Sequence, residues 1–80
     1  MNTTLKERIF KVMATVFETE VAALNENSST DTIEAWDSIK HLTLILALEE
    51  EFAISFPDEL VGEMVNFKLI EITIYEQLAN

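Results

Sequence analysis

The sequence predicts a small all-α protein with four helices, and three observations support this class. The chain has 80 residues, 49% of them hydrophobic, so we expect residues 1–80 to form one domain around one core. It has one glycine and one proline, so the residues that hairpin turns and phosphate loops require are nearly absent. Apolar residues recur at the spacing of helices that bury one face.

The first helix is predicted over residues 4–18. The segment from Thr4 to Glu7 has the spacing of a capping box, in which two side chains bond the free backbone N–H groups of a helix start. Phe10 lies off the centre of the apolar stripe, at its edge or on a second contact. The stripe itself consists of Leu5, Ile9, Val12, Met13, Val16 and Phe17.

Residues 19–36 are predicted to form one long loop. They are acidic and rich in Asn, Ser and Thr, whose side chains bond nearby backbone groups in place of a helix. Loops longer than about 15 residues are uncommon in compact domains unless they are functional. We therefore expect the loop to be held by Val21, Leu24, Ile33 and Trp36, and a short helical turn within it is compatible with the sequence.

The second helix, over residues 38–52, is predicted to be the core element. Asp37 is placed to cap it, which leaves Ser38 exposed in the first turn, beside the positive end of the helix dipole. Leu44 lies near the margin of a wide apolar stripe. That stripe contains Ile39, Leu42, Ile45, Leu46, Leu48 and Phe52.

A short third helix and a fourth helix complete the predicted fold. Pro57 suits the first position of a helix that ends before Gly62. Asn66 is the expected cap of the last helix, which presents Phe67, Ile70, Ile74 and Leu78. The alternation around residues 70–74 also suits a strand, but a single strand would lack a partner, so we expect a helix.

Charge and composition exclude several classes of function. Fifteen acidic against five basic residues give a formal charge of −10, which repels nucleic acids and favours partners with Lys or Arg patches. There is no cysteine, so disulfides and thiolate chemistry are excluded. No basic, apolar leader or membrane-length stretch is found, so we expect no membrane span and a cytoplasmic location.

Ser38 does not have the neighbours of a catalytic serine. The single histidine, His41, lies three residues on, without a G-x-S-x-G turn, an orienting partner or an oxyanion hole. The stretch from Asp31 to Asp37 likewise lacks the alternating oxygen ligands and central glycine of an EF-hand. The exposed hydroxyl suits covalent modification more than catalysis. No dedicated metal site is expected, and loose binding of divalent cations by clustered carboxylates is compatible with the sequence.

Three motifs in order resemble one known family. Asp37-Ser38-Ile39 resembles an Asp-Ser-Leu signature, residues 47–52 resemble the end of the helix that follows it, and residues 56–59 resemble the opening of the next helix. Over essentially its full length the chain resembles the acyl carrier protein family. The resemblance implies a four-helix bundle of acyl-carrier type, with a long loop between the first two helices and a short third helix.

The resemblance also implies how such a protein works. A separate phosphopantetheinyl transferase attaches 4′-phosphopantetheine to Ser38, within a site that includes Asp37 and Ile39. The arm then holds acyl or aminoacyl groups as thioesters, and the carrier catalyses nothing itself. The implied partners are acyl-transferring, ketosynthase or ligase-type enzymes with basic docking patches, and we expect the carrier to be a monomer.

Some residues depart from the fatty-acid pattern of the family. Ile39 replaces leucine, Trp36 precedes Asp37, and Lys40 and Thr43 replace acids. These changes favour a carrier for a specialised pathway, such as polyketide, modified lipid or aminoacyl-thioester synthesis, over the housekeeping carrier.

Two further expectations concern surfaces. Acidic residues beyond the middle of the second helix are predicted to form one partner-binding face, comprising Glu49, Glu50, Glu51, Asp58, Glu59 and Glu63. A pocket for an acyl chain is expected to open among Ile45, Leu46, Ile54 and Leu60, with a fully packed core as the alternative. The competing function is an acidic helical adaptor that binds a basic protein without a prosthetic group.

Overall fold

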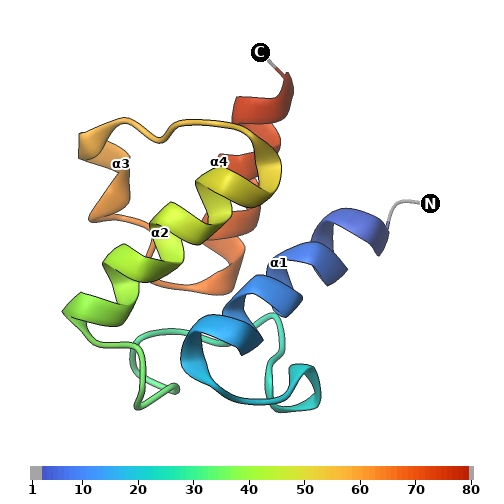
Figure 1. The fold of residues 1–80 in the computed structure, drawn as a ribbon, viewed down its shortest axis with the longest axis vertical. Coiled ribbons are helices and arrows are strands. Elements are labelled where there is room, and N and C mark those ends of the chain that lie inside the picture. The colour runs from blue at the N-terminus through green and yellow to red at the C-terminus, as the bar shows by residue number, and fades with distance from the viewer. Residues whose placement is uncertain (1–2, 80) are drawn as a thin grey trace.

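The computed structural model describes residues 3–79, and these form four α-helices and one short 3₁₀ turn (Figure 1). The elements are α1 (Thr3–Phe17), η1 (Val21–Ala23), α2 (Ser38–Phe52), α3 (Asp58–Val61) and α4 (Phe67–Ala79). Among the described residues the β-type pairing is one isolated bridge, between Ser29 and Asn66. The predicted all-α class, the long loop and the short third helix are confirmed.

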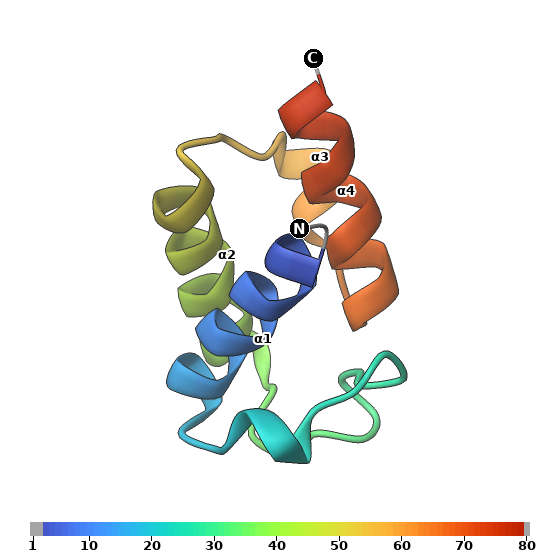
Figure 2. The same ribbon diagram turned by 90° about the vertical axis from the view of Figure 1, so that its right-hand side faces the viewer.

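The core lies where α1, α2 and α4 meet. Figures 1 and 2 together show α2 and α4 on opposite sides of the bundle, with α1 and α3 on the other two sides. Leu44 and Leu48 of α2 are fully buried, so the prediction that Leu44 lies at the margin of the apolar face is wrong. The other fully buried side chains are Ile9, Met13, Met64, Phe67, Ile70 and Ile74.

The apolar stripe of α2 is narrower than the sequence suggested. Ile39, Leu42 and Leu46 are exposed by 76%, 59% and 66%, so their predicted place in the core is wrong. The buried residues follow a different line, because neighbouring elements cover only one side of the helix. That line comprises Leu44, Ile45, Leu48 and Phe52.

The predicted helix starts are confirmed in part. α1 begins at Thr3, before the predicted cap at Thr4, which therefore lies inside the helix. α3 begins at Asp58, with Pro57 just before it rather than as its first residue. The cap of α4 is as predicted, because Leu69 N–H donates to Asn66 Oδ1 over 2.8 Å, and the segment is a helix rather than a strand.

Two predicted apolar contacts differ at the edges of the core. Leu78, expected on the buried face of α4, is 48% exposed near the end of the chain. Phe10, expected either at the edge of the apolar stripe or on a second contact, stacks on Phe67 with ring centroids 4.3 Å apart. Phe10 therefore links α1 to α4 from beside the main stripe.

Backbone bonds to the first residue of α4 and to Val65 before it hold the long loop in place. Phe67 N–H donates to the carbonyl of buried Ser28 (2.9 Å), and Thr30 N–H donates to the carbonyl of Val65 (3.0 Å). Apolar anchors supplement these bonds: Leu24 and Trp36 are buried and Ile33 is half-buried, whereas Val21 is exposed and its predicted anchoring role is wrong. The loop therefore reaches α2 in a defined position.

Candidate functional site

The start of α2 presents Ser38 to solvent. Asp37 has an extended backbone and its Oδ1 accepts from Lys40 N–H over 2.8 Å, which confirms the predicted N-cap. Ser38 is therefore the first residue of the helix, and its side chain is exposed. The helix dipole makes this end favourable for a negatively charged group, and the Asp37 carboxylate partly opposes that effect.

His41 is engaged on both ring nitrogens. Its Nδ1 lies 3.0 Å from Trp36 Nε1, and its Nε2 lies 2.7 Å from the carbonyl oxygen of Val61. An indole N–H only donates and a carbonyl only accepts, so the bonds fit the neutral ring with its proton on Nε2. His41 has no free nitrogen to activate Ser38.

A hollow of about 410 Å³ opens beside Ser38, between the start of α2 and the α3 segment, by which we mean α3 with its flanking residues, 56–65. Its lining is mainly apolar. None of the four residues predicted for an acyl pocket lines this hollow: Leu46 faces solvent, and Ile45, Ile54 and Leu60 are absent from its walls. A second hollow, of about 500 Å³, lies between α1 and α2 among charged side chains and does not include Ser38. The hollow beside Ser38 is lined by Thr30, Trp36, Asp37, Ser38, His41, Leu42, Val61, Gly62 and Val65.

An exposed apolar stripe runs along α2 from the Ser38 end. We call Ile39, Leu42 and Leu46 the α2 stripe; their spacing of three and four residues places them on one face. Contiguous exposed apolar side chains are typical of interaction surfaces. The hydropathy of α2 predicts a core face here, so the role of the α2 stripe as a candidate surface could not be predicted from the sequence.

The acids predicted to form one face divide into two groups. Glu49 Oε2 accepts from Phe56 N–H (2.8 Å), and Glu51 Oε2 lies 2.8 Å from Nε of Arg8. The Arg8 guanidinium also donates to the Glu51 carbonyl and lies 4.3 Å from the centre of the Phe52 ring. The remaining acids are exposed and form no ion pair among the described residues; they are Glu50, Asp58, Glu59 and Glu63.

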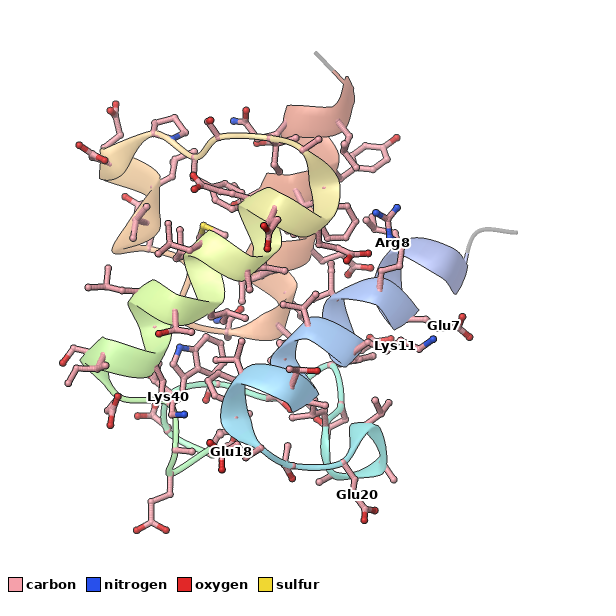
Figure 3. All side chains as sticks on the ribbon, in the orientation of Figure 1. Glu7, Arg8, Lys11, Glu18, Glu20 and Lys40 are labelled. Carbon is pink, nitrogen blue, oxygen red and sulfur yellow. The ribbon has the colours of Figure 1, made fainter. Side chains whose placement is uncertain are left out.

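Lys40 points away from the apolar stripe. Its Nζ donates to the carbonyl of Val16 over 3.1 Å and lies 3.6 Å from Glu18 Oε2 (Figure 3). Lys40 therefore ties the start of α2 to the end of α1.

Neither a metal centre nor a membrane helix is found in residues 3–79. In that part of the chain His, Asp and Glu side chains nowhere gather in a group of three able to hold a metal ion. None of its helices combines the length and apolar character needed to cross a bilayer.

Comparison with known proteins supports the family resemblance. No family model matches the chain. Among solved structures, the chain is similar to the holo acyl carrier protein from Geobacter metallireducens, determined by NMR. The two share 27% sequence identity and a TM-score of 0.82, over 96% of this chain and 87% of that one. The match confirms the family resemblance drawn from the motifs and indicates a carrier protein rather than an enzyme.

Proposed function

We propose that this chain, a protein of the acyl carrier protein family, carries acyl or aminoacyl groups as thioesters on a 4′-phosphopantetheine arm attached to Ser38. The observation that carries the proposal is the exposed Ser38 hydroxyl at the capped start of α2, beside an apolar hollow. In a chain with this fold, that hydroxyl is open to a modifying enzyme and has space beside it for an attached group.

The residues at this end of α2 fit such an arm. Ser38 Oγ offers the point of attachment, and the Asp37 cap fixes the first helical turn that presents it. The backbone N–H groups and dipole of that turn stabilise the charge of a phosphodiester. The bound arm supplies the thiol that a chain without cysteine lacks. The apolar hollow offers a surface against which the arm can lie.

Partner enzymes are proposed to dock on the α2 stripe and the unpaired acids around it. The stripe begins next to Ser38, so an enzyme that reaches this hydroxyl must approach Ile39 and Leu42. Glu50, Asp58 and Glu59 offer charge to a basic rim on the partner. Such partners are a phosphopantetheinyl transferase and enzymes of the acyl-transferring, ketosynthase or ligase type.

Departures from the fatty-acid pattern near Ser38 indicate the class of pathway that the carrier serves. Ile39 and Thr43 are exposed, and Lys40 is turned toward α1, so α2 from Ser38 to Leu48 presents apolar and neutral side chains rather than acids. A partner for this surface differs from one that recognises an acidic helix. We therefore propose a specialised pathway rather than housekeeping fatty-acid synthesis.

Intact mass spectrometry separates the carrier from an acidic adaptor. After incubation with a broad-specificity phosphopantetheinyl transferase, coenzyme A and Mg²⁺, the wild-type chain should gain the mass of one arm. The Ser38→Ala variant should gain nothing and should fold normally, because loss of an exposed hydroxyl costs at most about 0.5 kcal/mol. Ser55→Ala, at another exposed serine, is the matched control and should be modified fully. A wild-type chain that stays unmodified favours the adaptor.

A further inference from the structure

Helix α3 itself has little apolar packing, because the buried apolar residues of the α3 segment, Phe56 and Met64, lie outside the helix. The helix has four residues and none of them is buried, although Leu60 and Val61 are half-buried. Because buried apolar area supplies most of the stabilisation of a packed helix, α3 depends on other contacts for its position.

Two side chains of α2 bond the backbone at either end of this segment. Before α3, Phe56 N–H donates to Glu49 Oε2 over 2.8 Å. At the last residue of α3, the Val61 carbonyl accepts from His41 Nε2 over 2.7 Å. His41 and Glu49 are eight positions apart, about 12 Å along the helix axis, so they hold the segment at two separate points.

Trp36 fixes the tautomer of His41 and therefore the nitrogen that bonds to Val61. The indole is 4% exposed, and its Nε1–H donates to His41 Nδ1 over 3.0 Å. This bond keeps the proton of the neutral imidazole on Nε2, which is the atom that donates to Val61. The loop, α2 and α3 are thereby joined by one relay of hydrogen bonds.

We propose that His41 and Glu49 are positioning residues that set the place of α3 and so the width of the hollow beside Ser38. Val61 and Gly62 form the α3 wall of that hollow, and Ser38, His41 and Leu42 line its α2 side. Loss of either side-chain contact therefore loosens the α3 wall, while the opposite wall, which belongs to α2, keeps its position. The consequence for arm attachment rests on the proposed function; the consequence for α3 does not.

Amide hydrogen exchange on the unmodified chain tests the positioning directly. The reporters are Glu63 N–H and Met64 N–H, which bond to the carbonyls of Leu60 and Val61. In His41→Leu and in Glu49→Ala they should exchange about tenfold faster, as expected for the loss of one hydrogen bond. Amides of α4 should keep their rates. Unchanged rates at both reporters in both variants overturn the proposal.

Conservative and charge-matched variants separate positioning from general destabilisation. Glu49→Gln keeps a carbonyl oxygen that accepts from Phe56 N–H, so its exchange should stay close to wild type. Glu50→Ala removes the same charge one residue away, from a side chain without a bond to α3, and should leave the reporters unchanged. Equal acceleration in Glu50→Ala and Glu49→Ala overturns the role of the Glu49 bond.

Trp36→Phe tests the relay without changing His41. The nitrogen NMR shifts of the imidazole should report protonation on Nε2 in the wild type and a mixture of tautomers in the variant. The α3 reporters should exchange faster to a smaller degree than in His41→Leu. If Trp36→Phe keeps the wild-type tautomer and the wild-type exchange rates, the proposed role of Trp36 is overturned. If His41→Leu does not fold, Trp36→Phe still tests the proposal.

Transferase kinetics connect α3 to Ser38. In His41→Leu and Glu49→Ala the KM for the carrier should rise several-fold with kcat nearly unchanged, because a partner must order the loosened segment when it binds. If Ser38 is still modified but neither the KM nor the exchange rates change in the two variants, the inference is overturned. If the wild-type chain takes no arm, the proposed function fails, and the exchange experiment still decides the position of α3.

Discussion

The two apolar faces of α2 have similar composition and different surroundings. Leu44 and Leu48 are fully buried, whereas Leu42 and Leu46 on the same helix are 59% and 66% exposed. Burying a leucine side chain contributes about 1.5–3 kcal/mol, and leaving one exposed contributes almost nothing to folding. The buried face therefore accounts for the fold, and the exposed face is available for recognition.

The largest expected effect comes from truncating one leucine on each face. Leu48→Ala should lower the free energy of unfolding by about 2–5 kcal/mol, because it leaves a cavity in a fully buried site. Leu46→Ala should change it by no more than about 0.5 kcal/mol. Urea denaturation followed by circular dichroism measures both values. Equal losses in the two variants would contradict the division of α2 into a folding face and a recognition face.

The next effect concerns partner binding rather than stability. Leu46→Glu should leave the chain folded and raise the KM of a phosphopantetheinyl transferase by roughly tenfold, because it places a charge in an apolar contact. Ile72→Glu is the matched control: the Ile72 side chain is 53% exposed, and its helix, α4, lies across the bundle from α2 (Figure 2). Similar kinetics for the two variants would mean that the α2 stripe has no special part in docking.

A smaller effect is expected from the acids around the stripe. Glu49 bonds to the α3 segment, so reversing its charge would disturb the fold locally, and Glu50→Lys with Glu59→Lys is the cleaner pair. This double variant should raise KM a few-fold at low salt and less at physiological salt, because exposed charges act mainly on association and are screened.

The control for charge places the same reversals elsewhere. Glu7→Lys with Glu20→Lys changes net charge equally on α1 and beside η1, where Figure 3 shows both side chains away from α2. Similar kinetics for the two double variants would assign the acids to solubility or general steering rather than to a docking face.

Local signals in the sequence predicted the site, and distant contacts decided its surroundings. Asp37 and Asn66 were assigned as caps because a cap bonds to backbone only two or three residues away. The bounds of α2 followed from the same cap and from an uninterrupted periodic stretch. Ser38 was therefore placed correctly at an exposed helix start without knowledge of the rest of the fold.

Predictions failed where partners lie far apart in sequence. His41 meets Val61 across 20 positions and Arg8 meets Glu51 across 43, so the sequence alone could not show that these side chains are engaged. The same reason explains the error at Leu44 and Leu46. An apolar stripe wider than a neighbour can cover has no local mark that separates its buried part from its exposed part.

The smallest expected effect lies far from both faces of α2, at the exposed pair of Lys6 and Glu26. The hydrogen bond and charge of Lys6 lower the pKa of Glu26, and the bond to Glu26 raises the pKa of Lys6. A lowered carboxyl pKa stabilises the fold above the carboxyl's pKa in the unfolded chain, and this stability is lost as pH falls through the folded value. The Lys6 contribution is present below the lysine's unfolded pKa and lost as pH rises through its raised one. Because both side chains are solvated, Glu26→Gln should lower the thermal midpoint only slightly at neutral pH and not at all in acid below the folded pKa of Glu26. Thermal melts of the wild type and of Glu26→Gln at the two pH values measure this difference. If Glu26→Gln lowered the thermal midpoint at neutral pH as much as Leu48→Ala does, the loop would contribute to the core far more than its exposure indicates.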